Sequence, residues 1–280
     1  MKNILLPTDF SENSWNAINY AISFFENVEC NFYLLHVITV NTMVLEESNF
    51  MLDHNALDDL HTIPAKKKLQ GLLQRISKQS LNQENHKFYT LTDYNFFIES
   101  VRKTVEEKHV DLIVMGTKGA SGLEKYILGT NTADIITKVK CNTLAIPENS
   151  KFVRPKEIAF ANDFSLSHNL QVLQPVSDIL KRFQSSLRIV HIKKNNTDLS
   201  DDEKKNKELI EDFFTNKNYS FHYLTNKKVE DAIQCFVESR DINMICMVAK
   251  NLNYFQQILF HSKIENISYH TDIPFLILHK

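Results

Sequence analysis

Glycine is scarce in this chain, since only five of its 280 residues are glycine. At the usual frequency of ~7%, about twenty would be expected. Four of the five lie within a short stretch near the middle of the chain, and none follows it. The five are Gly71, Gly116, Gly119, Gly122 and Gly129. Because glycine permits backbone conformations and close approaches that other residues do not, this cluster is the strongest indication of a functional segment.

Long apolar runs and a one-sided charge are also lacking. No apolar stretch approaches the ~18 residues of a membrane-spanning helix, and the run at 4–6 is too short for the core of a signal peptide. The 32 Lys and Arg nearly balance the 34 Asp and Glu, which argues against nucleic-acid binding by bulk electrostatics. We therefore expect a cytoplasmic protein that binds neither membrane nor nucleic acid.

Clustered metal ligands and recognisable catalytic sets are lacking as well. The four cysteines, Cys30, Cys141, Cys235 and Cys246, form no C-x-x-C pair. Their neighbours are strand-like or helical, so we expect buried, reduced thiols. No Ser/His/Asp or Cys/His set can be argued from spacing, and we predict neither a catalytic residue nor a protein metal site.

What the chain does contain is a regular alternation of short apolar runs and amphipathic segments. The first half predicts strands at 2–7, 32–37, 86–91, 111–115 and 143–146. Between them the spacing predicts helices that begin after Ser11 as N-cap and that cover about 54–80, the region 96–105 and 132–139. Strands that alternate with helices indicate parallel pairing, with helices on both faces of the sheet.

The second half of the chain repeats this order. IAFANDFS at 158–165 matches ILLPTDFS at 4–11, and INMICMVAK at 242–250 matches VDLIVMGTK at 110–118. Agreement at several points in the same order indicates a tandem duplication. We predict two open, mostly parallel five-stranded α/β domains, residues 1–149 and 150–280, joined by a polar stretch.

The glycine cluster begins where a predicted strand ends and finishes where a helix begins. In parallel α/β sheets, ligands bind beyond the carboxyl ends of the strands, and helix N-termini present free amides to phosphate. Neither the P-loop pattern G-x-x-x-x-G-K-[ST] nor the dinucleotide pattern G-x-G-x-x-G occurs in the chain. The pattern that occurs is G-x2-G-x9-G-T, from Gly116 through Gly119 to Gly129 and Thr130.

With this spacing the sequence resembles the universal stress protein family. Nucleotide-binding members of that family carry G-x2-G-x9-G-[ST] between the fourth strand and the fourth helix. Two further family elements match, namely an Asp just after the first strand, here Asp9, and a Val near the end of the second, here Val37. The resemblance covers nearly the whole chain as two copies, and it implies an adenine nucleotide alpha hydrolase-like fold.

The resemblance implies that the first domain binds ATP or another adenine nucleotide, with Mg²⁺ as a candidate accompanying ion. The phosphates would lie against the glycine loop and the helix that follows it. The nucleoside would lie against the end of the first strand, and the adenine against Val37. The implied nucleotide-binding residues are Pro7, Thr8, Asp9, Val37, Met115, Gly116, Thr117, Gly119, Gly129, Thr130, Asn131 and Thr132.

The second copy departs from this pattern at each glycine. In register, the three motif glycines become Val248, Asn251 and His261, although Asp163 and Ser262 match Asp9 and Thr130. Side chains then stand where backbone would approach a phosphate. We therefore do not expect the second domain to bind ATP in the same way.

Simpler interpretations remain open for several of these residues. Asp9 and Ser11 can serve only to cap the first helix, and Val37 can be an ordinary core residue. His36 and His191 occupy matching positions, and we interpret them as buried histidines bonded to carbonyl groups. The glycine cluster itself can be a loop without a ligand.

The leading hypothesis is therefore a nucleotide-dependent regulator in the stress response. The resemblance further implies that the two domains pair through their last strands as a pseudo-dimer. A homodimer of the full chain and unidentified protein partners stay open. One alternative is a slow, metal-assisted ATPase in which Lys118 or Asp9 aids the reaction. Another is a protein-interaction module without a small ligand.

Overall fold

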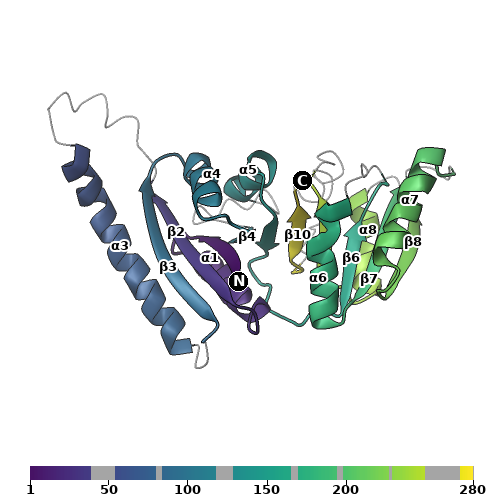
Figure 1. Ribbon diagram of the computed structural model, residues 1–280, viewed down its shortest axis with the longest axis horizontal. Helices are drawn as coiled ribbons and strands as arrows, with labels where there is room; N and C mark the ends of the chain where they lie inside the picture. The colour runs from purple at the N-terminus through teal and green to yellow at the C-terminus, as the bar shows by residue number, and fades with distance from the viewer. Residues whose placement is uncertain are drawn as a thin grey trace.

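A computed structural model of the chain describes residues 1–38, 54–79, 84–117, 129–164, 170–193, 198–226, 229–249 and 272–279. These residues include a ten-stranded sheet with the strand order β3-β2-β1-β4-β5-β10-β9-β6-β7-β8. Figure 1 shows the amino-terminal half on the left and the carboxyl-terminal half on the right, with β10 at their junction.

The helices and strands alternate along the chain as the sequence predicts. The first half contains β1 (Lys2–Pro7), α1 (Glu12–Phe24), β2 (Cys30–Ile38), α3 (His54–Gln79), β3 (His86–Tyr94), α4 (Phe97–Glu107), β4 (Leu112–Gly116), α5 (Thr130–Lys138) and β5 (Thr143–Ile146). The second half contains β6 (Glu157–Ala161), the 3₁₀ helix η1 (Leu170–Leu173), α6 (Gln174–Phe183), β7 (Ser186–Lys193), α7 (Asp201–Phe214), β8 (Tyr219–Thr225), α8 (Val229–Ser239), β9 (Met244–Val248) and β10 (Phe275–Leu278).

The sheet is parallel within each half and antiparallel where the halves meet. β1 pairs with β2 and β4 in parallel, and β6 pairs with β7 and β9 in the same way. At the junction β10 runs antiparallel to β5, with Phe275 opposite Ala145. The predicted fold class is confirmed, and the two five-stranded sheets are joined into one through β5 and β10, the last strand of each half.

Helices cover both faces of this sheet. On one face α1, α3, α6 and α7 contribute Phe24, Leu69, Leu180 and Phe214 to a hydrophobic core that runs through both halves. On the other face α4 and α5 cover the first half, and α8 covers the second with a core around Phe236. Burial on this scale contributes about 25 cal/mol per Å² of apolar surface. One face of the sheet therefore ties the two halves into a common core.

The segment that joins the halves is held by α1. The side-chain amide Nδ2 of Asn16 donates to the backbone carbonyls of Pro147, Glu148 and Ser150, at 3.3, 3.2 and 2.8 Å. These hydrogen bonds satisfy backbone carbonyls that follow β5 and no longer pair with a neighbouring strand. The joint that the sequence predicts from its polarity is thus an ordered connection.

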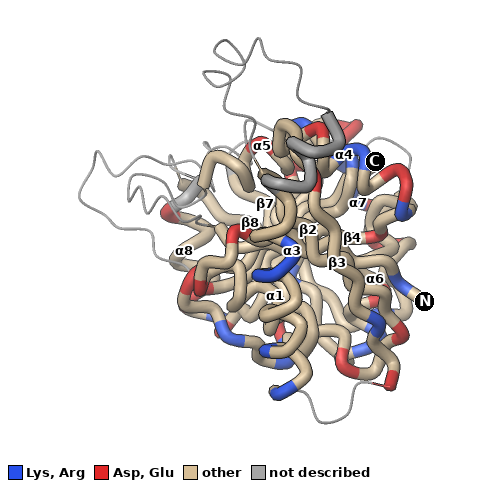
Figure 2. Tube along the Cα trace, turned by 90° about the vertical axis from the view of Figure 1, so that its left-hand side faces the viewer, with Lys and Arg blue, Asp and Glu red and all other residues tan. Residues whose placement is uncertain are grey.

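Charges of both signs are mixed over the molecule. Figure 2 shows Lys and Arg interspersed with Asp and Glu along the described part of the trace. Among the described residues, no helix is long and apolar enough to cross a membrane.

Candidate functional site

Three neighbouring parallel strands end on the same side of the sheet, the side formed by their carboxyl ends, which we call the carboxyl edge. β1 lies between β2 and β4, so the carboxyl ends of all three strands meet there. The backbone ladder continues just past the strands, because the Thr8 amide donates to the Leu35 carbonyl at 2.8 Å and the Thr117 amide donates to the Ile146 carbonyl at 2.9 Å. This edge therefore brings Asp9, Val37 and Thr117 into one region.

The helices that follow β1 and β4 leave this edge on opposite faces. α1 packs into the core that contains Ile4 and Leu6, whereas α5 contributes Ile135 to the core that contains Leu5 and Met115. The strand order reverses at this point, because the chain runs from β1 to β2 on one side and returns to β4 on the other. In open α/β sheets, ligands bind at such a switch point.

The first turn of α5 is tied to the end of β4. The Gly129 amide donates to the Thr117 carbonyl, and the Thr132 hydroxyl donates to the Gly116 carbonyl at 2.8 Å. Gly129 is the N-cap residue, and it has extended backbone and no side-chain cap hydrogen bond. The next two amides, those of Thr130 and Asn131, belong to a first turn in which amides have no intrahelical acceptor. Both residues are exposed, so this turn presents donors and a partial positive charge at the edge.

Gly116 has a packing role that the sequence does not reveal. A Cβ atom at this position would lie 2.7 Å from Nδ2 and 2.8 Å from Oδ1 of Asn13, on α1. Contacts that short require the neighbour to move. We interpreted this glycine from the sequence as a means of close approach to a ligand, and the structure adds close approach to α1. The Thr132 hydroxyl likewise faces inward, where it bonds the Gly116 carbonyl rather than a ligand.

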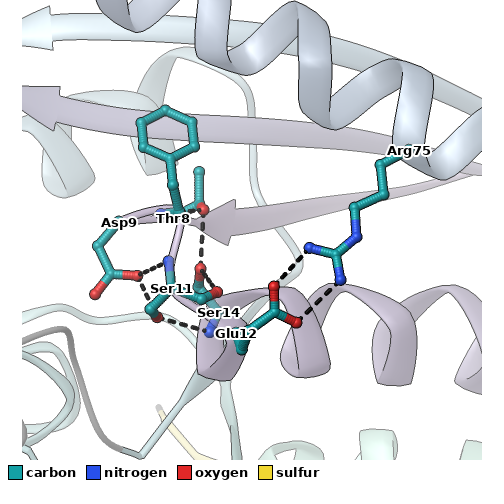
Figure 3. Close-up of polar contacts among 7 residues, drawn as sticks. Thr8, Asp9, Ser11, Glu12, Ser14 and Arg75 are labelled. Atoms are coloured by element: carbon teal, nitrogen blue, oxygen red, sulfur yellow. Dashed lines mark hydrogen bonds and ion pairs between the residues drawn. The ribbon is translucent and has the colours of Figure 1, made fainter.

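Asp9 organises the start of α1, as Figure 3 shows. Its Oδ1 accepts hydrogen bonds from the Ser11 amide at 3.0 Å and from the Ser11 hydroxyl at 2.6 Å. The Ser11 oxygen in turn accepts from the Ser14 amide at 3.1 Å, which caps the helix. The prediction of Ser11 as N-cap is confirmed. Because Asp9 is also exposed at the edge, its capping role leaves the carboxylate accessible.

A strained turn precedes this cap. Phe10 has a φ of 64°, which is unusual for a bulky residue, and its amide donates to the Thr8 hydroxyl at 3.1 Å. Its ring lies 4.4 Å from the ring of His36, whose Nδ1 donates to the Thr8 carbonyl at 2.8 Å. The His ring thus braces the turn that presents Asp9.

The second half contains the same arrangement. Phe164 has a φ of 57°, and its ring lies 4.6 Å from that of His191. The His191 Nδ1 donates to the Asn162 carbonyl at 3.1 Å. The predicted bond to a carbonyl is therefore confirmed for both histidines, but the predicted burial holds only for His191, since His36 is half-buried. The positive φ of the two Phe residues was not predicted, because a bulky aromatic residue gives no sequence signal for it.

An ion pair fixes α1 against α3. The guanidinium of Arg75 donates to both carboxylate oxygens of Glu12, at 2.8 and 2.9 Å (Figure 3). It also lies 4.0 Å from the ring centroid of Trp15. The hydrogen bonds from Arg75 lower the pKa of Glu12. Both side chains are largely exposed, so the pair contributes at most about 1 kcal/mol.

The predicted nucleotide-binding residues divide by exposure. The buried members form the frame of the edge, and they are Pro7, Thr8, Met115, Gly116, Thr117 and Thr132. The members with accessible surface are Asp9, Val37, Gly129, Thr130 and Asn131. Val37 also packs against the core of its face, so a core role and an exposed surface coexist there. Gly119 and Lys118 lie outside the described residues.

The corresponding edge of the second half is built differently. Val248, in the register of Gly116, is 8% exposed and belongs to the hydrophobic core. The backbone ladder is nonetheless the same, because the Ala249 amide donates to the Leu278 carbonyl at 2.9 Å. A side chain therefore occupies the position where the first half has none. Asn251, His261 and Ser262 lie outside the described residues.

Three of the four thiols of this chain are buried. Cys30, Cys141 and Cys246 are buried, and burial raises the pKa of Cys30 to about 11 and that of Cys141 to about 12. The prediction that all four thiols are buried is wrong for Cys235, which is exposed on α8. Its neighbours Phe236 and Val237 face the core, and the helical turn carries Cys235 outward. No group of three or more His, Cys, Asp or Glu in the described ranges is placed to hold a metal ion.

Comparison with known proteins adds independent findings. The model of the universal stress protein family matches residues 1–147. A universal stress protein of Methanocaldococcus jannaschii is 28% identical over 152 residues, which are 54% of this chain and 84% of that protein. A second one from the same organism is 28% identical over 149 residues, 49% of this chain and 89% of that protein.

A solved structure extends the similarity of fold over the whole chain. The universal stress protein of Archaeoglobus fulgidus superposes with a TM-score of 0.68 at 18% identity. The match covers 98% of this chain and 97% of that protein. The second half, which lies beyond the family match, therefore belongs to the same fold.

Proposed function

Because the chain belongs to the universal stress protein family, we propose that its amino-terminal half binds ATP or a related adenine nucleotide. One observation carries this proposal. The first turn of α5 lacks a side-chain cap and is tied to the end of β4, at the same edge as the exposed Asp9 and the half-buried Val37. This arrangement offers separate surfaces for a phosphate, a ribose and a base.

The phosphates would bind at the start of α5. The amides of Thr130 and Asn131 lie at the positive end of the helix dipole, which favours an anion. Gly129 has no side chain to obstruct that approach. The link between Gly129 and Thr117 holds this turn at a defined position relative to β4. Preorganised donors of this kind bind phosphate without a large ordering cost.

The nucleoside would bind across β1 and β2. The Asp9 carboxylate, fixed through Oδ1 to Ser11, is an acceptor for a ribose hydroxyl. Val37 offers apolar surface to the adenine ring. A Mg²⁺ ion that accompanies the nucleotide would be held mainly by the phosphates, with the exposed Asp9 carboxylate as a candidate oxygen ligand.

We further propose that residues 1–149 and 150–280 are two copies of one domain, of which the second has lost the nucleotide site. The mirrored strand order and the repeated Phe–His turn support this division. The pairing of β5 with β10 supports an intramolecular pseudo-dimer. The protein would then act in the stress response as a regulator whose nucleotide favours one interaction surface over another.

Calorimetric titration of the full chain with ATP tests the site. We expect saturable binding, and a loss of at least about ten-fold in affinity for Gly129→His, which imitates the second copy at the phosphate position. The backbone at Gly129 has a φ of −64°, which His can adopt, so this variant should fold. Absence of measurable ATP affinity in the wild-type protein would overturn the proposal.

A matched pair of carboxamide variants supplies the control. Asp9→Asn keeps an oxygen that can hold Ser11 but removes the charge, so we expect weaker nucleotide binding with an intact helix cap. Asp163→Asn makes the same change in the second half and should leave the affinity unchanged. Equal effects of the two variants would contradict the assignment of the site to the first half.

Slow hydrolysis is the alternative activity, and the exposed Asp9 carboxylate at the nucleotide edge is the observation that favours it. Phosphate release from ATP with Mg²⁺ above the spontaneous rate, lost in Asp9→Asn, would support turnover. Binding without phosphate release would support the regulatory role.

A further inference from the structure

A cavity lies at the opposite edge of the sheet from the proposed nucleotide site. Its volume is about 470 Å³, within the range of small-molecule pockets. Lys2 at the start of β1, Asp111 just before β4 and Asn142 just before β5 line one side. Gln174 and Arg182 of α6 line the other. The cavity therefore lies between the two halves, at the amino ends of the strands.

Most of the cavity wall is apolar. Ile4 and Leu144 contribute from the first half of the sheet, and Leu276 contributes from β10. Phe24 of α1 and Ile179 of α6 close it from the helix layer. All five of these side chains are buried. A ligand here would gain most of its binding energy from apolar contact.

Arg182 is the exception in this wall. Its guanidinium lies 4.4 Å from the ring centroid of Phe24, 5.1 Å from that of Phe25 and 4.4 Å from that of Phe183. Within the described residues, Arg182 makes no hydrogen bond or ion pair, and its Nε is buried without an acceptor. The faces of this guanidinium are covered by rings, and its buried Nε–H lacks an acceptor.

The other charged groups of the cavity already have partners. Lys2 lies 3.7 Å from Oδ1 of Asp111, whose Oδ2 accepts from the Asn3 amide at 2.7 Å. Asp178 accepts from the Gln174 side chain at 2.8 Å. Asp178 also attracts Arg182 electrostatically, but the two side chains form no ion pair within 4.0 Å. Among the described charges of this cavity, Arg182 is therefore the one without a direct hydrogen bond or ion pair, although Asp178 attracts it.

Burial lowers the pKa of Arg182 to about 10, so the side chain stays cationic at neutral pH. A half-buried cation whose Nε is buried without an acceptor is unfavourable unless something else supplies that acceptor. Planar anions such as carboxylates match the guanidinium donors closely. Such a group, attached to an apolar body, would complement both the cation and the wall.

We propose that this cavity binds a small, mainly apolar molecule that carries one anionic group, and that Arg182 receives that group. The site is separate from the proposed nucleotide site and lies against both halves of the chain. Occupation would bridge β1, β4 and β5 to α6 and β10, and it would stabilise the junction through ligand binding.

Two fluorescent probes of the same apolar shape test the proposal on the full chain. 8-Anilino-1-naphthalenesulfonate carries one anion, and N-phenyl-1-naphthylamine is its uncharged counterpart. We expect one saturable site for the anionic probe, weakened at least about ten-fold by Arg182→Gln. The neutral probe should bind this variant within about two-fold of wild type, because it makes no ionic contact.

Two further variants keep the test decisive. Gln174→Glu places a negative charge at the exposed rim and is expected to weaken the anionic probe alone, even if Arg182→Gln folds poorly. Arg75→Gln removes another ring-stacked arginine, one that already has an ion pair outside the cavity, and should change neither probe. Excess ATP should leave the anionic probe bound. Unchanged affinity in both cavity variants, or displacement by ATP, would overturn the proposal.

Discussion

At the scale of single residues, Gly116 meets two demands at once. Its carbonyl accepts the Thr132 hydroxyl, and its missing side chain makes room for Asn13. The first contact positions the turn that faces the proposed phosphate site, and the second positions α1. A glycine in a binding motif is therefore also a packing residue here, and substitutions at this position change stability as well as binding.

Gly116→Ala is expected to destabilise the protein by about 1–3 kcal/mol, because the new Cβ would overlap the Asn13 side chain. Asn13→Ala in the same chain should recover much of that loss. Urea denaturation of the single and double variants measures both effects. Gly71→Ala is the matched control: its Cβ meets nothing within 4 Å, and the helix interior favours Ala by about 0.5–1 kcal/mol. Additive effects of Asn13→Ala and Gly116→Ala would contradict the proposed overlap.

The cysteines give a second residue-scale prediction. A raised pKa keeps a thiol protonated and unreactive at any pH below it, and burial blocks access as well. In native protein at pH 8, Cys235 should react quickly with Ellman's reagent, while Cys30, Cys141 and Cys246 should react only after denaturation. Cys235→Ser should abolish the fast phase. Rapid reaction of more than one thiol in the native state would contradict the burial of the other three.

At the scale of elements, a substitution at the start of α5 is expected to change the stability of the helix and the affinity for ATP in opposite directions. Gly129 has N-cap geometry without a side-chain cap, so Gly129→Asp should stabilise the helix by a few tenths of a kcal/mol. The same carboxylate would repel a phosphate at the same amides. We therefore expect thermal stability to hold or rise while ATP affinity falls at least about ten-fold.

Gly129→Ser separates the effect of the negative charge on ATP binding from the effect of the helix cap. The Ser hydroxyl can cap the helix without a negative charge, so affinity for ATP should stay within about three-fold of wild type. Thermal unfolding and calorimetric titration of the two variants supply both readouts. Equal ATP affinity in Gly129→Asp and wild type would place the phosphates elsewhere.

The elements themselves were largely predictable, and their contacts were not. Apolar periodicity placed the strands, and the Ser11 cap followed from capping chemistry, whereas the helix predicted at 132–139 begins earlier, at Thr130. The link from Asn13 to Gly116 joins residues about a hundred positions apart, and no local pattern encodes it. The cavity at Arg182 was missed for the same reason, because its walls come from both ends of the chain.

At the scale of the whole molecule, the halves share a sheet and a core. The pairing of β5 with β10 gives the sheet a continuous hydrogen-bond ladder, and one hydrophobic core contains side chains from α1, α3, α6 and α7. Two copies of an α/β domain could also have packed as separate bodies; the residue pattern did not distinguish these arrangements, and only the family resemblance implied pairing through the last strands. The aromatic contact between Phe24 and Phe183, with ring centroids 5.3 Å apart, crosses the junction on one face.

Because the two halves share a sheet and a core, we predict that they unfold together in one cooperative transition. The single tryptophan, Trp15, lies on α1 and reports on the first half, whereas far-ultraviolet circular dichroism reports on both halves. Urea unfolding curves from the two signals should coincide, because loss of one half exposes the shared core of the other. A circular dichroism transition well separated from the fluorescence transition would show that the halves unfold independently.

The stoichiometry of ATP binding to the full chain tests the central claim most directly. Calorimetric titration is expected to give one nucleotide per chain, with binding lost in Gly129→Asp and retained in Asp163→Asn. No binding to the wild-type protein, or two equivalent nucleotides per chain, would contradict the assignment of one functional and one degenerate copy.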